Sequence, residues 1–151
     1  MEDCNFESKD VLAYIFRKCA EFGLEVSITK GQKLLYCCYG LLLASDNARL
    51  CKEHPACWTY GPVFPSSYKA WREGKLDFSN KTIKVIESNE HLKDVMESAL
   101  KYFGKASASK LIAWTHLPNS PWALCSNNGR HLYKDIDDVL IRDCFLPFIK
   151  R

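Results

Sequence analysis

The sequence lacks several features that would identify a common class of protein. It has no run of five or six like charges, and 21 Lys plus Arg against 18 Asp plus Glu leave a formal net charge of only +3. So small and scattered a charge gives no reason to expect nucleic acid or anionic lipid as a partner. The seven glycines are dispersed and form neither GxGxxG nor GxxxxGK, so no phosphate-binding loop is predicted.

Targeting and membrane-spanning segments are also missing. Residues 1–5 are acidic and lack the basic-then-apolar order of a secretory signal. The longest apolar run, residues 34–44, is shorter than the roughly 20 residues that cross a bilayer. We therefore expect a cytoplasmic protein that has no membrane partner.

Eight cysteines form an even count, but the sequence contains no CxxC pair. Cys51, His54 and Cys57 recur at a regular spacing, which makes them a candidate metal site. Structural zinc, however, takes four ligands that usually arrive as two short pairs. We expect free, mostly buried thiols with no metal and no cofactor, since a reducing compartment keeps cysteines unpaired.

The feature that dominates the sequence is the run from Gln32 to Ala44, in which only Gln32 and Lys33 are strongly polar. A helix that is apolar on nearly all sides is enclosed by the rest of its domain. Thr29 and Gln32 have the spacing of a capping box, in which two side chains satisfy free backbone N–H groups. The pattern predicts a central helix over residues 30–46.

The fold class predicted for residues 1–151 is mainly α, as one compact domain of about five to six helices with Gly/Pro-rich aromatic loops. A chain of this length can bury about 70% of its unfolded surface, which suffices for one core. Residues 81–86 alternate loosely between polar and apolar side chains, as a short edge strand does. Apolar spacing and capping residues predict further helices over residues 9–22 after Ser8, 66–73, 90–103 after Asn89, 108–116 after Ser107, and 136–145 before Pro147.

Aromatic residues are concentrated in the segments that contain glycine and proline. These residues are Trp58, Tyr60, Phe64, Tyr68, Trp71, Trp114 and Trp122. Two roles fit them. Packing of the loops onto the core would bury them, whereas exposure beside Arg or Lys would make them anchors of a partner-binding surface.

Three motifs occur in a fixed order: Gln32-Lys33-Leu34-Leu35-Tyr36, then Trp58-Thr59-Tyr60-Gly61-Pro62-Val63-Phe64-Pro65 with Tyr68, then Thr115-His116 followed by Pro121-Trp122. Together they resemble the SocA-like antitoxin domain, also called Panacea and formerly a phage-associated domain of unknown function. The resemblance covers about residues 9–145. One departure is that residues 117–120 contain no acid, whereas the third motif of the family often has a Glu before Pro-Trp.

The resemblance implies a mostly helical, non-enzymatic protein of a toxin–antitoxin system that neutralises a cognate protein toxin by direct interaction. In one branch of the family the antitoxin resembles a proteolytic adaptor that delivers its toxin to an AAA+ protease. No catalytic residue is expected, and no DNA-binding region is expected in a chain of this length.

We expect the two aromatic loops to pack over the ends of the central helix. The alternative is a small enzyme or ligand-binding domain that uses the pocket between these loops, with His116 as acid or base and Lys33 or Tyr36 holding an anion. The predicted partner-binding or motif residues are Gln32, Lys33, Tyr36, Trp58, Tyr60, Gly61, Pro62, Tyr68, Trp71, Thr115, His116, Pro121 and Trp122.

Overall fold

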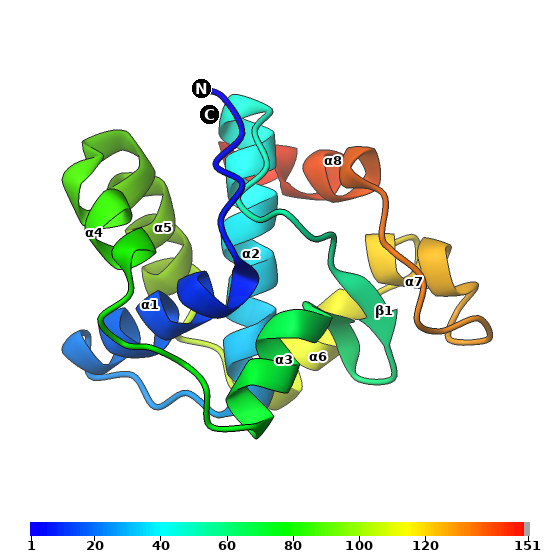
Figure 1. The fold of residues 1–151 in the computed structure, drawn as a ribbon. Helices are drawn as coiled ribbons and strands as arrows, with labels where there is room; N and C mark the ends of the chain where they lie inside the picture. Colours follow the sequence, from blue (N-terminus) through cyan, green and yellow to red (C-terminus); the bar gives the residue numbers. More distant parts are fainter. Residues whose placement is uncertain (150–151) are drawn as a thin grey trace.

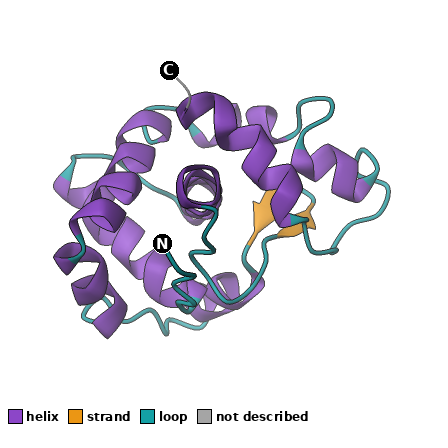
Figure 2. Ribbon diagram, turned by 90° about the horizontal axis from the view of Figure 1, so that it is seen from above, coloured by secondary structure: helices purple, strands orange, loops and turns teal. Residues whose placement is uncertain are grey.

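The helix α2 (Ile28–Asp46) runs through the middle of the molecule, and a computed structural model describes residues 1–149 around it. Seen from above, α2 stands end-on inside a ring formed by the other helices (Figures 1 and 2). Every residue from Gly31 to Leu43 is buried. The prediction of an enclosed central helix is therefore confirmed.

The mainly α fold class is also confirmed, although residues 1–149 hold eight helices rather than five or six. The remaining elements are α1 (Ser8–Glu21), β1 (Ala56–Trp58), β2 (Gly61–Val63), α3 (Pro65–Arg72), α4 (Lys81–Ser88), α5 (Glu90–Phe103), α6 (Ala108–Thr115), α7 (Pro121–Ser126) and α8 (Asp138–Ile149). The two helices that the sequence did not predict are α4 and α7. No helix among the described residues is long and apolar enough to cross a membrane.

The edge strand predicted over residues 81–86 is wrong, because this segment is the helix α4. The side chain of Asn80 accepts a hydrogen bond from the N–H of Ile83 (3.1 Å) and so caps the helix. Ile83 and Ile86 face the core, whereas Val85 is exposed. The apolar residues of this short segment suit one face of a helix as well as they suit a strand, and the cap decides between them.

The β structure lies instead in a segment that the sequence predicted to be irregular. β1 and β2 form an antiparallel hairpin in which Trp58 pairs with Gly61. The strands have three residues each and carry no alternating pattern. This hairpin contains most of the second sequence motif, whose last residues, Phe64, Pro65 and Tyr68, lie at the start of α3.

Two predicted helix starts need correction. Ser8 is not a cap, because its hydroxyl donates to the carboxylate of Glu53. α2 begins earlier than predicted, since Ser27 rather than Thr29 caps it by accepting from the N–H of Lys30 (3.2 Å). The caps at Asn89 and Ser107 are confirmed, with distances of 3.1 Å to the N–H groups that they accept.

The last helix, α8, packs along α2 and continues past Pro147, which was predicted to end it. Gly40 makes this packing possible, because a Cβ there would overlap the ring of Phe145. That ring contacts Tyr36 and Trp114 edge-on, at centroid distances of 5.5 and 5.6 Å. All eight cysteines are free thiols, as predicted, and five of them are buried.

Candidate functional site

Gln32, near the beginning of α2, joins the hairpin to α3. Its Nε2 donates to Ser67 Oγ (2.8 Å), and its Oε1 accepts from the N–H of Phe64 (2.9 Å). Both ends of this buried amide are therefore satisfied. The contacts fix the point at which β2 passes into α3.

Lys33 brings the three motifs together. Its Nζ donates to the carbonyl oxygen of Pro62 (3.2 Å). A Cβ on Gly61, whose φ is +113°, would come within 2.7 Å of both Lys33 Cε and Thr115 Oγ1. The chain therefore needs glycine at this position, because its backbone conformation suits glycine and because Lys33 of α2 and Thr115 of α6 lie too close to it for a side chain.

Burial lowers the pKa of two basic side chains here, Lys33 and His116. It lowers the pKa of Lys33 to about 8, so the ammonium is still mostly charged at neutral pH. Burial also lowers the pKa of His116, and the nearby charge of Lys33 lowers it further. The His116 ring stacks on Trp122 with centroids 3.8 Å apart, and its buried Nε2 has no hydrogen-bond partner within residues 1–149.

The second and third motifs are tied directly to each other. Trp122 Nε1 donates to the carbonyl oxygen of Trp58 (2.7 Å). Ser120 caps α7 by accepting from the N–H of Ala123 (3.1 Å), and its hydroxyl donates to the carbonyl oxygen of Thr115 (2.7 Å). The hairpin and the segment from α6 to α7 therefore form one connected platform over the first half of α2.

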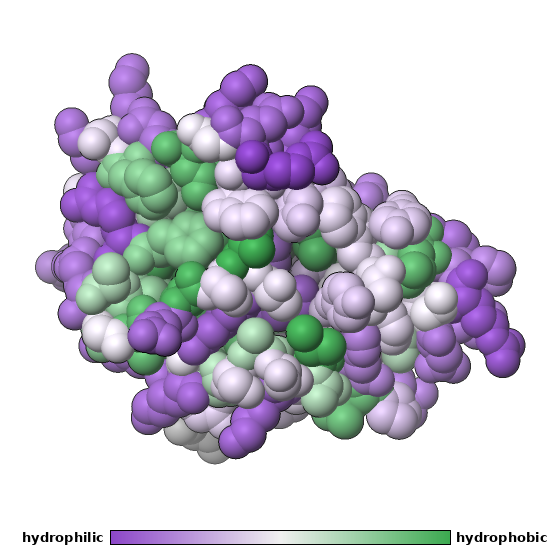
Figure 3. All heavy atoms as spheres, turned by 90° about the horizontal axis from the view of Figure 1, so that it is seen from below, coloured by the Kyte–Doolittle hydropathy of each residue, from purple (hydrophilic) through white to green (hydrophobic). Residues whose placement is uncertain are grey.

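Five aromatic side chains, which we call the aromatic surface, lie over this platform: Trp58, Tyr60, Tyr68, Trp71 and Tyr133. The Trp58 ring contacts the rings of Tyr68 and Tyr133 at centroid distances of 5.4 and 5.9 Å, and Tyr68 contacts Trp71 at 5.8 Å. Tyr60 and Tyr133 are 67% and 68% exposed. Figure 3 views the end of the molecule at which α2 begins, with pale and apolar spheres across its middle and hydrophilic ones along its rim.

A cavity of about 380 Å³ opens within the aromatic surface. Four aromatic residues, Trp58, Tyr60, Tyr68 and Tyr133, form much of its wall, and Gln32 and Lys33 also line it. The structure thus brings the first motif and the second motif to one cavity. Trp71 belongs to the aromatic surface but does not line this space.

Tyr133 is a site residue that the sequence did not predict. The segment from Tyr133 to Ile136 runs beside β1, where the N–H of Tyr133 donates to the carbonyl oxygen of Cys57 (2.7 Å) and the N–H of Cys57 donates to that of Lys134 (2.9 Å). Tyr133 has a φ of +68°, which is unusual for a residue with a side chain. Asn127, Asn128 and Gly129 are residues that favour a turn, but they do not show where the chain returns.

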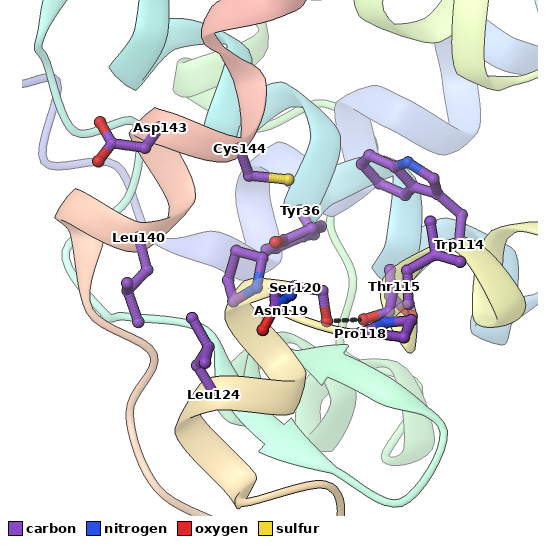
Figure 4. Close-up of a pocket in the computed structure, with 12 residues that line it drawn as sticks. Tyr36, Trp114, Thr115, Pro118, Asn119, Ser120, Leu124, Leu140, Asp143 and Cys144 are labelled. Atoms are coloured by element: carbon purple, nitrogen blue, oxygen red, sulfur yellow. Dashed lines mark hydrogen bonds between the residues drawn. The ribbon is translucent and has the colours of Figure 1, made fainter.

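Tyr36 lies in a different place from Lys33. It lines a second cavity of about 400 Å³ between α8 and the segment from α6 to α7, together with Ser120, Leu140 and Cys144 (Figure 4). Burial raises the pKa of the Tyr36 hydroxyl well above its ordinary value, so this group is neutral. The two residues named as alternative anion ligands do not share one cavity.

The predicted site residues therefore divide into two groups. Residues enclosed by the fold are Gln32, Lys33, Tyr36, Gly61, Pro62, Thr115, Pro121 and Trp122. Residues that solvent reaches in whole or in part are Trp58, Tyr60, Tyr68, Trp71 and His116. The first group lies within or beneath the platform, and the second presents its side chains wholly or partly at the surface.

The arrangement gives little support to metal or thiol chemistry. No group of three or more His, Cys, Asp or Glu within residues 1–149 could hold a metal ion, so Cys51, His54 and Cys57 do not form one. Burial raises the pKa of the Cys37, Cys38 and Cys51 thiols, which disfavours the thiolate that a nucleophile needs.

Comparison of the chain with known proteins identifies its family. No solved structure matches the chain significantly. The chain is 29% identical over 154 residues to a protein named Antitoxin SocA from Caulobacter vibrioides (strain NA1000 / CB15N), in an alignment that covers 92% of this chain and 82% of that protein. A family model described as "Antitoxin SocA-like, Panacea domain" matches residues 32–123, which contain all three motifs. The chain therefore belongs to the SocA-like, Panacea-domain family, which is a family of antitoxins rather than of enzymes.

Proposed function

We propose that this protein neutralises a cognate protein toxin by binding it directly through the aromatic surface. Membership of an antitoxin family supports an antitoxin role, and such a role requires a toxin as partner. The observation that carries the choice of surface is the exposure of Tyr60 and Tyr133, about two thirds each, around a cavity. Exposed aromatic side chains beside a pocket are typical of the residues that dominate binding energy in protein interfaces.

The platform beneath the aromatic surface supports this proposal. Lys33 and Trp122 donate hydrogen bonds to the hairpin, and Gln32 accepts one from Phe64 directly after it, so the hairpin is held against α2 and α7. Ring contacts with Trp58 in turn hold Tyr68 and Tyr133. A surface fixed in this way loses little conformational entropy on binding, so more of the contact energy appears as affinity.

Basic side chains flank the aromatic surface in sequence. Lys69 and Arg72 lie on α3 beside Tyr68, and Arg130 and Lys134 lie near Tyr133; all four are exposed. Two exposed acids lie beside these four groups, Glu73 after Arg72 and Asp135 after Lys134. A surface with this excess of positive charge favours an acidic face on the partner, through faster association and better-defined orientation.

The experiment uses the product of the neighbouring open reading frame as the candidate toxin. Co-expression is expected to restore growth, and the two proteins are expected to elute as one complex in size-exclusion chromatography. Tyr60→Ala should weaken the complex by about 30-fold or more, which is the threshold of an interface hot spot. Tyr102→Ala is the matched control, because Tyr102 is 64% exposed but lies on α5, away from the aromatic surface.

Two results would contradict the proposal. One is the absence of both growth rescue and a complex with the neighbouring gene product. The other is a complex that Tyr60→Ala and Tyr102→Ala weaken equally, because this would place the toxin elsewhere on the protein.

Delivery of the toxin to an AAA+ protease is a separate proposal that rests on the family resemblance. Direct binding is its first step, so both mechanisms require the same complex. They differ in the lifetime of the toxin, which delivery shortens and sequestration does not. A pulse-chase measurement of toxin half-life, with and without this protein and in cells lacking the protease, distinguishes the two.

A further inference from the structure

The ammonium group of Lys33 is a buried cation without a counter-ion among the described residues. Lys33 is only 1% exposed, and its one hydrogen bond goes to the carbonyl oxygen of Pro62, although an ammonium group has three donors. No carboxylate within residues 1–149 lies within 4.0 Å of it. Buried charges in proteins are normally paired, because leaving water costs several kcal/mol per ion.

Lys18 shows how the same fold treats another buried lysine. It is 6% exposed, and its Nζ lies 2.7 Å from Glu87, 3.5 Å from Glu21 and 3.7 Å from Glu97. Three carboxylates from three helices therefore surround that cation. The missing partner of Lys33 is a property of its site rather than of buried lysines in this protein.

The surroundings of Lys33 indicate what its missing partner is. Lys33 lines the 380 Å³ cavity whose wall contains Trp58, Tyr60, Tyr68 and Tyr133. Gln32 also lines this space, but both ends of its amide are already bonded to Ser67 and Phe64. Lys33 is thus the one charged residue in an otherwise largely apolar and aromatic wall.

We propose that this cavity is a subsite for a carboxylate on an apolar stem, supplied by an acidic side chain of the protein partner, with Lys33 as its counter-ion. This inference rests on the proposed function. A single cation suits a carboxylate, whereas phosphate groups are usually held by several donors such as Arg forks or helix N-termini. A partner protein, unlike a small ligand inside the cavity, also covers the exposed rings of Tyr60 and Tyr133 around it.

The first experiment tests the subsite with a small probe, independently of any toxin. 3-Phenylpropionate carries a carboxylate on an apolar stem, and 3-phenylpropionamide is its neutral match. We expect the acid to shift the indole N–H resonance of Trp58 in the NMR spectrum, and the amide to shift it far less. Equal shifts from the acid and the amide, or none from either, would overturn the proposal.

The second experiment uses Lys33→Met, which removes the charge and keeps much of the stem. Removal of a buried charge that has no counter-ion offsets the loss of the hydrogen bond to Pro62, so we expect a Tm that is not lowered, together with toxin binding weakened by about 30-fold or more. Lys18→Met is the matched control, for which we expect a lowered Tm and unchanged binding. A lowered Tm and unchanged binding for Lys33→Met would instead mean that Lys33 only supports the hairpin, and would overturn the proposal.

The results of these experiments distinguish a failure of the carboxylate subsite from a failure of the proposed function. If Tyr60→Ala weakens the toxin complex while Lys33→Met does not and the acid probe fails to bind, the subsite is refuted and the docking surface stands. If the acid binds in a Lys33-dependent way but no toxin complex forms, the partner protein is refuted as the source of the carboxylate and the proposed function falls with it.

Discussion

Substitution of Gly61 tests most directly whether the three motifs meet at this residue. In Gly61→Ala, the new Cβ would lie 2.7 Å from Lys33 Cε and 2.7 Å from Thr115 Oγ1. Neither neighbour moves easily, because Lys33 is enclosed and Thr115 Oγ1 donates to the carbonyl oxygen of Ile112 (2.8 Å). The variant must therefore push α6 or the hairpin away from α2.

The expected cost has two parts. Overpacking of a well-filled interior typically costs about 1–3 kcal/mol. A side chain at a positive φ adds about 1–2 kcal/mol. Together they predict a loss of about 2–5 kcal/mol in the free energy of unfolding, which is a large share of the stability of an ordinary domain.

Gly74→Ala is the control for the backbone part alone. Gly74 has a φ of +68°, and nothing lies within 4 Å of the position that its Cβ would take. This variant should lose only about 1–2 kcal/mol. Urea unfolding of both variants gives the comparison, and equal losses would show that α2, β2 and α6 do not meet at Gly61 as described.

Two further predictions concern the contacts that hold the fold and the platform. The hydrogen bond from Lys18 holds the pKa of Glu87 below its usual value of 4.5, so this carboxylate stabilises the native state at neutral pH and loses that effect as the pH falls through the lowered pKa. Glu87→Gln should therefore be less stable than wild type in urea at pH 7, with a difference that shrinks in acid; a difference independent of pH would argue against the ion pair. Trp122→Phe removes the donor to the carbonyl oxygen of Trp58 and should cost about 1–3 kcal/mol in the same assay. No loss of stability would mean that this bond does not join the hairpin to α7.

Local signals in the sequence predicted the helices well. The run from Gln32 to Ala44 could only be an enclosed helix, and the caps at Asn89 and Ser107 marked two further starts. The errors lie where a short segment satisfies two patterns at once. Residues 81–86 fit a helical face and a strand alternation equally, and the cap made by the side chain of Asn80 favours the helix.

The candidate site was harder to predict, because it depends on contacts between distant segments. Gln32 and Lys33 stand out as polar residues in an apolar helix; the start of α3 bonds both ends of the Gln32 amide, and the hairpin gives Lys33 one carbonyl oxygen but no counter-ion. No pattern in the sequence indicated that Tyr133 would return beside β1 and pack on Trp58. That placement follows from backbone pairing across more than seventy residues, which periodicity does not encode.

The central claim is that the toxin covers the aromatic surface, and amide hydrogen exchange of the free protein and of the toxin complex tests it most directly. We expect slower exchange in the complex at residues 59–60, 66–75 and 129–134, which are largely exposed segments around the cavity. Exchange in α4 and α5, which lie on another side of α2, should be unchanged (Figure 1). Protection confined to α4 and α5, with none in the three segments around the cavity, would contradict the claim.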